Sequence, residues 1–274
     1  MSFAGQTAWI TGASSGIGAA LAKVLADQGA RLVLSGRKVD ALEAVAADCG
    51  GDCLVLPFET TDIAALAPAV AKAWDWSGAG IDLLVNNAGI SQRSLAVETA
   101  YPVYQRIIDV DLLAPIALTQ EILPRMAARK WGRLAYISSI AGKVGVPMRT
   151  AYCAAKFGLA GYADALRAET SVLGLKVHTI YPGSIRTDVS RNALTADGSA
   201  RGASDSVIDN GIDPLVAAKW MADAMLADER EIIVAEGGEA KMGELRRTPD
   251  ALLDQVAAMM AAGYADKMKS EAQQ

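Results

Sequence analysis

Two kinds of segment alternate along the chain, and each has its own pattern of hydrophobic positions. The first kind is a short, nearly continuous apolar run, as expected of a strand covered on both faces. The second is rich in Ala and Leu and repeats its apolar positions with helical spacing. The predicted strands are Thr7–Ile10, Arg31–Leu34, Cys53–Phe58, Ile81–Val85, Arg133–Ile137, Lys176–Tyr181 and Glu231–Ala235. The predicted helices are Ile17–Gln28, Asp40–Asp48, Asp62–Trp76, Val103–Arg129, Ala151–Leu173 and Pro214–Ala227.

The order of these segments predicts the fold class. Repeated strand–helix–strand order implies right-handed crossovers and a doubly wound, mostly parallel sheet. We expect one Rossmann-type α/β domain over residues 1–274, with a seven-stranded sheet and helices on both faces. No internal repeat, Pro-rich linker or low-complexity block divides the chain.

Two regions fall outside the alternation. Residues 185–212 are polar and lack a clear period, and long irregular segments inside compact domains are usually active-site lids or disordered. We predict a substrate lid there. Residues 249–269 return to helical spacing and predict a C-terminal helix, whose apolar stripe we expect to pack on its own domain or on a second subunit. The stripe comprises Leu252, Val256, Met259, Met260 and Tyr264.

Composition narrows the class of protein. The chain of 274 residues is 52% hydrophobic, which is sufficient for a large core and excludes a disordered protein. Its net charge of −5 argues against a nucleic-acid partner bound through phosphate contacts. The odd set of cysteines, Cys49, Cys53 and Cys153, favours a cytoplasmic location. We expect no membrane anchor, because the chain has no basic-then-apolar leader and no run of about 18 apolar residues.

Hydrolase and metal chemistry are disfavoured. His178 is the only histidine and falls in a strand that is predicted to be buried, so a Ser-His-Asp hydrolase has no evident base. Cys49 and Cys53 lack a second pair of ligands, so we predict no metal site.

A glycine-rich turn follows the first predicted strand. Glycine allows tight turning and close approach to a pyrophosphate, and the next helix directs unpaired N–H groups and its positive dipole end at the phosphates. The spacing G-x-x-x-G-x-G differs from the common G-x-G-x-x-G, and glycine that serves packing alone is the competing interpretation. The predicted cofactor residues of the turn are Gly12, Ser14, Ser15, Gly16, Ile17 and Gly18.

The end of the second strand bears on which dinucleotide binds. A ribose 2′-hydroxyl is normally held by Asp or Glu roughly 20 residues after the turn, but here Arg37 and Lys38 follow the strand and the next carboxylate is Asp40. A guanidinium matches a 2′-phosphate through its planar fork. We therefore predict that NADP(H) is favoured and NAD is possible, the alternative being a solvated basic pair.

Polar residues at other strand ends converge on the same sheet edge. Tyr152 and Lys156 are four apart on one predicted helix and so share a face. Ser138 and Ser139 end one strand, and Asn86–Gly89 ends another, at the carboxyl edge where doubly wound sheets bind ligands. Together with the glycine-rich turn after the first strand, these are three strand ends at one crevice, and they indicate a reaction centre.

Together these motifs resemble the short-chain dehydrogenase/reductase family over roughly residues 5 to 235, in the family's order and spacing (compare). The motifs are the Thr11–Gly18 turn, Asn86–Gly89, Ser139, Tyr152-x-x-x-Lys156 and Pro182-Gly183. More narrowly, residues 89–94 and 140–153 resemble the branch that contains 11-beta-hydroxysteroid dehydrogenases and the dehydrogenase/reductase member seven type.

The resemblance implies a role for each matched residue. Tyr152 would exchange its phenolic proton with the carbonyl oxygen as hydride moves at carbon, and an adjacent ammonium favours the phenolate. Lys156 would supply that charge and bind the nicotinamide ribose, and Ser139 would donate a hydrogen bond to the same oxygen. The resemblance also assigns further residues to the cofactor cleft: Glu59, Thr60, Asn87, Ala88, Gly89, Pro182, Gly183, Ile185 and Thr187.

One position departs from the family pattern. Where the family usually carries a fourth catalytic residue, Asn, this chain has Asp111. Asn offers a donor and an acceptor, whereas an ionised Asp only accepts. We predict that Asp111 is a proton-relay residue that partly offsets the charge of Lys156, against the alternative of a structural role.

The expected reaction is hydride transfer between a nicotinamide and a ketone or secondary alcohol. A mostly apolar substrate pocket is predicted from Ile90 together with Ser91, Gln92, Val144, Val146 and Met148. The alternatives are a non-catalytic nucleotide sensor and a dehydratase or epimerase on the same fold. By resemblance, two Ala-rich helices would pair with a second subunit, so we expect a homodimer or homotetramer.

Overall fold

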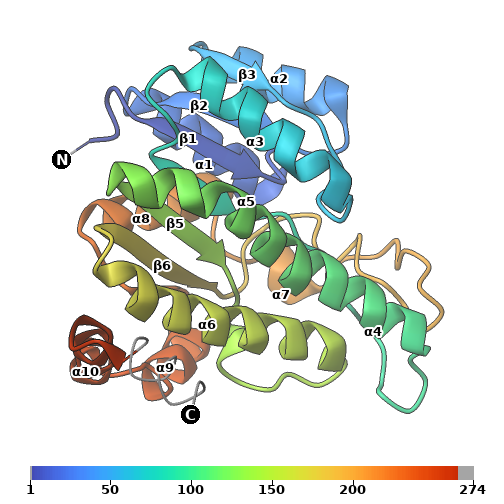
Figure 1. Ribbon diagram of the computed structural model, residues 1–274. Coiled ribbons are helices and arrows are strands. Elements are labelled where there is room, and N and C mark those ends of the chain that lie inside the picture. Colours follow the sequence, from blue (N-terminus) through green and yellow to red (C-terminus); the bar gives the residue numbers. More distant parts are fainter. Residues whose placement is uncertain (1, 265–274) are drawn as a thin grey trace.

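The core of the protein is a parallel β-sheet of seven strands, seen in a computed structural model that describes residues 2–264 (Figure 1). Neighbouring strands are parallel throughout, in the order β3-β2-β1-β4-β5-β6-β7, which confirms the predicted fold class. The strands are β1 (Thr7–Thr11), β2 (Arg31–Ser35), β3 (Cys53–Val55), β4 (Leu83–Asn86), β5 (Gly132–Ile137), β6 (Leu175–Pro182) and β7 (Glu231–Val234).

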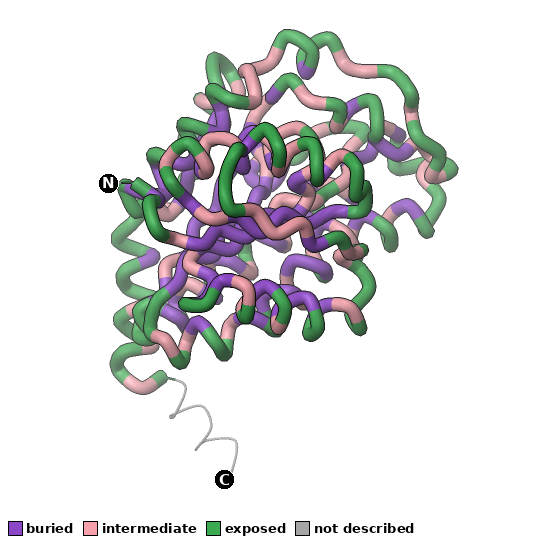
Figure 2. Tube along the Cα trace, turned by 90° about the horizontal axis from the view of Figure 1, so that it is seen from above, coloured by how far each residue is buried: buried purple, intermediate pink, exposed green. Residues whose placement is uncertain are grey.

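Helices cover both faces of this sheet, so strand residues are buried on either side (Figure 2). One face packs against α1 (Gly16–Asp27), α2 (Val39–Cys49) and α8 (Pro214–Leu226). The other packs against α3 (Ile63–Ser77), α5 (Ala114–Arg129) and α6 (Thr150–Ser171). This double cover explains why the strands appear in the sequence as apolar runs without alternation.

The strand order reverses between β1 and β4, and this reversal determines where a ligand can bind. In a doubly wound sheet the crossovers on either side of such a point leave a crevice beyond the carboxyl ends of the strands. Thr11, Asn86, Ile137 and Pro182 end their strands at that edge. The loops that follow them carry the predicted site residues.

The helix predicted over residues 103–129 is divided in the structure. It consists of α4 (Tyr101–Ile108), the π-helical segment η1 (Asp109–Leu113) and α5. A π-helical turn carries one residue more than an α-helical turn, and such turns are frequent at functional sites. Strand β3 is shorter than predicted, because Pro57 has no N–H with which to continue a ladder.

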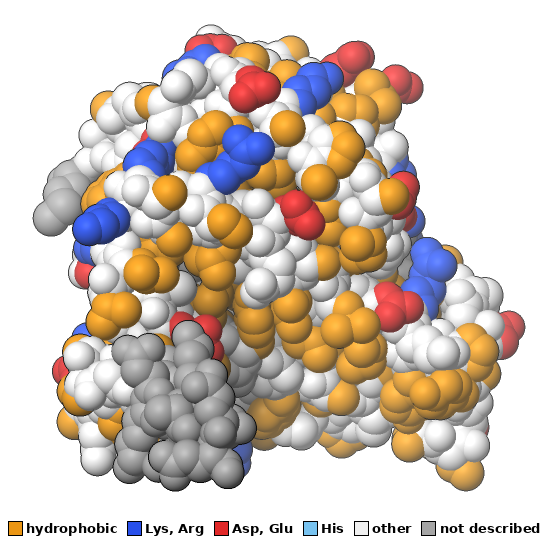
Figure 3. Space-filling model, viewed as in Figure 1, with side chains coloured by type: hydrophobic (Ala, Val, Ile, Leu, Met, Phe, Trp, Pro, Cys, Tyr) orange, Lys and Arg blue, Asp and Glu red, His pale blue; other side chains and the backbone are white. Residues whose placement is uncertain are grey.

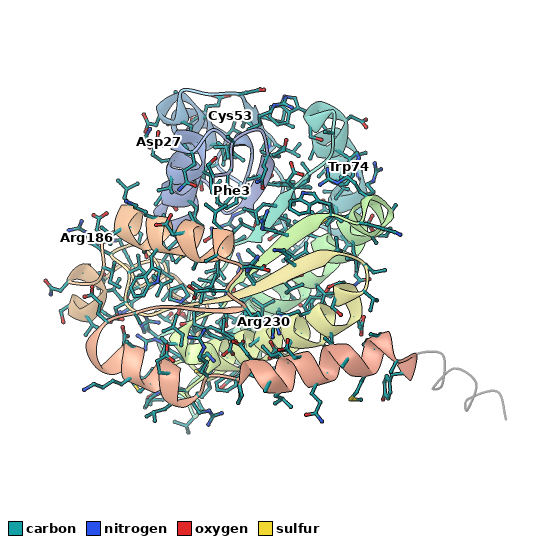
Figure 4. The ribbon with its side chains drawn as sticks, turned by 90° about the vertical axis from the view of Figure 1, so that its left-hand side faces the viewer. Phe3, Asp27, Cys53, Trp74, Arg186 and Arg230 are labelled. Carbon is teal, nitrogen blue, oxygen red and sulfur yellow. The ribbon has the colours of Figure 1, made fainter. Side chains whose placement is uncertain are left out.

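The C-terminal region differs from its prediction in two ways. Helix α9 (Gly237–Leu245) was not predicted, and α10 (Asp250–Ala261) covers part of the predicted helix, whose residues 265–269 lie outside the described residues. Leu252, Val256 and Met259 of the apolar stripe are exposed, so these side chains do not pack on their own domain, and packing on a second subunit stays a prediction. Instead Leu253 is buried, α10 packs on α6, and Arg230 holds Asp254 (Figure 4).

Within residues 2–264, no helix combines the length and the apolar character needed to cross a lipid bilayer.

His178 is a core side chain of β6, and it makes stability depend on pH. Its Nδ1 lies 2.6 Å from the Glu229 carbonyl oxygen, while burial lowers the pKa of His178 from 6.5 to about 4. The unfolded chain binds this proton near pH 6.5 and the folded protein only near pH 4. The stabilisation that this pKa difference provides is therefore expected to be fully present above pH 6.5. As the pH falls to 4, the free energy of unfolding is expected to decrease by ~3 kcal/mol.

Urea unfolding of the wild type and of His178→Asn at several pH values measures this loss. Other carboxylates also titrate in the window, so the difference between the two proteins is the quantity of interest. An equal loss of stability in both would contradict the assignment to His178.

Candidate functional site

The turn between β1 and α1 has the geometry of an anion-binding loop. Gly12 and Gly16 adopt φ values of 64° and 55°, which disfavour other residues. A Cβ at Gly12 would come 2.9 Å from the backbone of Ala88, and one at Gly16 would come 3.1 Å from Thr187. The Ser15 side chain does not cap α1, and the first helical residues, Gly16 and Ile17, line the cavity, so N–H groups at this helix end are available to a ligand. The turn thus fits a dinucleotide diphosphate.

Side chains from β1 and the end of β4 fix this turn to its neighbour. The Thr11 hydroxyl accepts hydrogen bonds from the N–H groups of Asn87 (3.0 Å) and Ala88 (3.1 Å). The Asn87 amide donates to the carbonyl oxygens of Thr11 (2.8 Å) and Gly12 (3.2 Å). A Cβ at Gly18 would collide with both the Gly12 carbonyl and the Asn87 amide, so Gly18 serves close packing beneath the turn.

The two serines after β5 have different surroundings. Ser138 is buried, and its hydroxyl donates to the Lys156 carbonyl at 3.0 Å. Ser139 is partly exposed; its hydroxyl accepts from the Ala141 N–H (3.1 Å) and lies 3.5 Å from the Pro182 carbonyl oxygen. Both line the same cavity, but only Ser139 has a hydroxyl that weak local contacts leave available to a ligand.

Tyr152 and Lys156 lie one turn apart near the start of α6. The Lys156 ammonium is 5.5 Å from the centroid of the Tyr152 ring. It is buried and donates to the Ile137 carbonyl oxygen at 3.0 Å, so its position is fixed. Within residues 2–264 no protein group hydrogen-bonds the Tyr152 hydroxyl, which faces the cavity wall shared with Ser139.

Asp111 sits on the π-helical segment and is 1% exposed. One carboxylate oxygen accepts from the Ile90 N–H at 2.8 Å, and the other lies 3.1 Å from the Lys156 ammonium. Burial raises the pKa of Asp111, while Lys156 and the Ile90 N–H act in the opposite direction. Burial also acts to lower the pKa of Lys156, but Asp111 and Tyr152 outweigh it and leave that pKa raised. The result is a buried ion pair directly behind Tyr152.

The basic residue after β2 is close to a carboxylate as well. Arg37 Nη1 lies 3.5 Å from Glu59 Oε2, with the two side chains 61% and 43% exposed. Exposed pairs of this kind contribute about 0–1 kcal/mol, so the guanidinium is easily redirected to a ligand. Lys38 and Thr60 line the cavity beside them.

One cavity of about 930 Å³ runs from Arg37 to Tyr152 and brings nearly all predicted site residues together. It is lined by every predicted cofactor residue except Gly18, and by Ser139 and Asp111. Part of its outer wall comes from the predicted lid segment, through Asp188, Val189, Asn192, Leu194 and Ile208. Sequence reasoning missed the part that comes from α4 and η1, namely Pro102, Gln105, Arg106, Asp109 and Val110.

The predicted substrate pocket needs correction. Of its six residues Ile90 lines the cavity, whereas the other five are not in its wall: Ser91, Gln92, Val144, Val146 and Met148. Gln92 is fully buried, and its side chain joins two neighbouring segments through hydrogen bonds. Its amide donates to Thr99 Oγ1 at 3.0 Å, and its carbonyl accepts from the Ala151 N–H at 2.9 Å. Met148 is exposed at a φ of 64°.

The 185–212 segment covers the cavity mouth and is tied down at Asp205. Its carboxylate accepts from Arg93 Nε at 2.7 Å, lies 3.5 Å from Arg149, and is also bound by Arg201. Ser206–Asp209 forms the short helix α7, and Ile185 pairs with Ile212 in an isolated bridge. The contact with Arg201 is local, whereas Arg93 and Arg149 are 112 and 56 positions from Asp205, and no periodicity in the sequence predicts those two contacts.

Comparisons with known proteins agree with this geometry. Residues 6–198 match the short chain dehydrogenase family. The chain is 38% identical over 234 residues to mouse (Mus musculus) dehydrogenase/reductase SDR family member 7B, covering 83% of this chain and 72% of that protein. The zebrafish (Danio rerio) protein of the same name is 36% identical over 262 residues, covering 92% and 84%. A short-chain dehydrogenase structure from Streptomyces avermitilis superposes with a TM-score of 0.77 at 26% identity, covering 97% of this chain and 99% of that one.

The glycine turn, the strand ends and the Tyr152–Lys156 helix line one cavity, and residues 6–198, which include them, match the family. The chain therefore belongs to the short chain dehydrogenase/reductase family of oxidoreductases.

Proposed function

We propose that this protein transfers hydride between a nicotinamide cofactor and a ketone or secondary alcohol, with Tyr152 as the acid/base. The observation that carries the proposal is that Ser139, Tyr152 and Lys156 share one cavity wall with an uncapped glycine turn. The turn fits the diphosphate of a dinucleotide, which directs the nicotinamide end toward Tyr152. A bound nicotinamide would supply or accept the hydride.

The protein groups handle the proton and the charge on oxygen. Tyr152 donates its phenolic proton to the carbonyl oxygen in reduction and takes it back in oxidation. Ser139 donates a hydrogen bond to the same oxygen and stabilises the charge that develops on it. The Lys156 ammonium favours negative charge on the phenol oxygen, and Asp111 with the Ile137 carbonyl holds that ammonium in place.

NADP(H) is the favoured cofactor in this proposal, because Arg37 lines the adenosine end of the cavity and is only weakly paired. Arg37→Ala is expected to weaken NADPH binding by roughly 10- to 100-fold, since a charged hydrogen bond to the 2′-phosphate is lost, and to leave NADH binding nearly unchanged. Titration of both reduced cofactors by fluorescence measures this. Equal affinity for NADPH and NADH in the wild type would count against the role of Arg37.

The substrate we propose is a carbonyl compound of modest to large apolar size. Ile90, Val189, Leu194 and Ile208 provide apolar surface on the side of the cavity beyond Tyr152, and Asn192 and Gln105 add polar groups that orient a ligand. In this proposal the 185–212 segment is the lid over the substrate. The ion pairs of Asp205 with Arg93 and Arg149 hold this segment in place.

Assembly as a homodimer or homotetramer in the cytoplasm is part of the proposal. Hydrophobic side chains gather on the face formed by α5 and α6 (Figure 3). Phe157 of α6 is 38% exposed and Leu113, immediately before α5, is 49% exposed. Exposed apolar patches of this kind can mark a surface that binds another subunit.

Turnover tests the proposal directly. The absorbance of reduced nicotinamide is followed with NADPH and NADH across a panel of ketones. Cofactor binding with no turnover of any carbonyl substrate would favour a nucleotide sensor. Conversion of a substrate without net oxidation of the cofactor would favour a dehydratase or epimerase.

A further inference from the structure

Helix α9 lies against two loops that line the cavity: the loop after β5, which carries Ser139, and the loop after β6, which carries Ser184. It packs on β7 and on the 3₁₀ turn Ile140–Gly142, which follows Ser139 directly. Gly243 of α9 is so close to Ile140 that a Cβ there would come 3.0 Å from the Ile140 side chain. The family match spans residues 6–198, so this helix lies outside it.

The strongest contact is between Glu239 of α9 and Ser184, two residues after Pro182. One Glu239 carboxylate oxygen accepts from the Ser184 N–H at 2.8 Å, and the other accepts from the Ser184 hydroxyl at 3.0 Å. Both bonds are assisted by the carboxylate charge, which makes them stronger than neutral ones. A Cβ on Gly183 would collide with the same carboxylate and would come 2.9 Å from Ala235 Cβ, so glycine leaves room for both neighbours.

The Ser139 side is tied to the same part of the chain. Lys143, four residues after Ser139, donates to Glu231 Oε1 at 2.8 Å and to the Arg246 carbonyl at 3.1 Å. Glu231 Oε2 in turn accepts from the Thr248 N–H at 2.7 Å. Lys143 and Glu231 are both buried, so this pair does not fluctuate as a surface pair would.

We propose that Glu239 is a positioning residue for the reaction: it holds Ser184, and through Ser184 the Pro182–Thr187 wall against which the nicotinamide is placed. This inference rests on the proposed function. Pro182, Gly183, Ile185 and Thr187 line the cavity opposite Tyr152, whereas Glu239 lies behind them and does not reach the cavity. A carboxylate is suited to the task, because it satisfies an N–H and a hydroxyl of one residue simultaneously.

The test compares the whole cofactor with a fragment that lacks nicotinamide. Glu239→Gln keeps the size of the side chain but retains only one acceptor oxygen. It is expected to weaken binding of NADPH (or NADH, if the wild type uses it) and to lower kcat, each by about tenfold, because a displaced wall misaligns the reacting groups. Binding of the fragment, ADP-ribose with or without its 2′-phosphate, is expected to remain unchanged.

Ser184→Ala removes only the hydroxyl bond to Glu239 and leaves the bond from the Ser184 N–H, so its effect is expected to be smaller than that of Glu239→Gln. The combined variant is expected to show less than the sum of the two effects, because both substitutions weaken one contact. Glu244→Gln is the matched control: it is on the same helix, exposed, and paired only with Arg247. It is expected to change none of these quantities.

Equal weakening of cofactor and fragment, together with a lower melting temperature, would reduce Glu239 to a structural role. Unchanged binding and kcat in Glu239→Gln would also overturn the inference. The binding comparison does not need turnover, so it gives an answer even where the wild type reduces no carbonyl, an outcome that counts against the proposed function alone.

Discussion

Tyr152→Phe is expected to lower kcat for carbonyl reduction by roughly 10²- to 10⁴-fold, because the proton donor to the carbonyl oxygen is lost. Cofactor affinity and thermal stability are expected to stay close to those of the wild type, since no protein group among residues 2–264 hydrogen-bonds the Tyr152 hydroxyl. Steady-state kinetics, cofactor titration and thermal unfolding of the same preparations measure the three quantities.

Tyr162→Phe provides the matched control on the same helix. It also removes one phenolic hydroxyl, but Tyr162 does not line the cavity and its hydroxyl contacts Gln120. This variant is expected to keep its activity. A Tyr152→Phe enzyme as fast as the wild type would refute the acid/base assignment.

Lys156→Met is expected to cost both activity and stability. Removing the ammonium leaves Asp111 buried without its partner, and breaking a buried ion pair in this way typically costs about 3–5 kcal/mol. Without Lys156, burial is opposed only by the Ile90 N–H bond and raises the pKa of Asp111 further, so the loss is expected to be larger at pH 8 than at pH 5, where the unpaired carboxyl can be protonated. Urea unfolding at several pH values measures it.

The double variant Lys156→Met/Asp111→Asn separates the two effects. With the buried charge removed as well, most of the stability is expected to return, whereas activity is not. Failure of the second substitution to restore stability would show that Asp111 and Lys156 are not an ion pair. Asp111→Asn alone bears on the relay: an unchanged rate and pH profile would leave Asp111 a structural residue.

The glycine turn, Ser139 and the Tyr152–Lys156 pair were accessible from the sequence for a local reason. A four-residue spacing on a helix places two side chains on one face, and strand ends in a parallel sheet meet at one edge. Asp111 was recognised as a departure from the family pattern, but its pairing with Lys156 needed the π-helical turn, which no hydrophobic period announces.

The substrate pocket and the C-terminal region were less accessible. Gln92 and Met148 were predicted to line the pocket. Gln92 is instead buried, with its side chain hydrogen-bonded to Thr99 and Ala151, and Met148 is exposed to solvent. The apolar stripe of α10 has helical spacing but is exposed, because spacing determines which residues share a face and not what that face meets.

The sequence by itself therefore determined the doubly wound sheet and the local motifs of the reaction centre, since burial on both faces and helical spacing are properties of neighbouring residues. Only the tertiary structure decided the outer wall of the cavity, the Asp111–Lys156 pair and the contact of Glu239 with Ser184. The two contacts join residues that are 45 positions apart (Lys156 and Asp111) and 55 positions apart (Glu239 and Ser184). Such long-range proximity leaves no period in a single sequence.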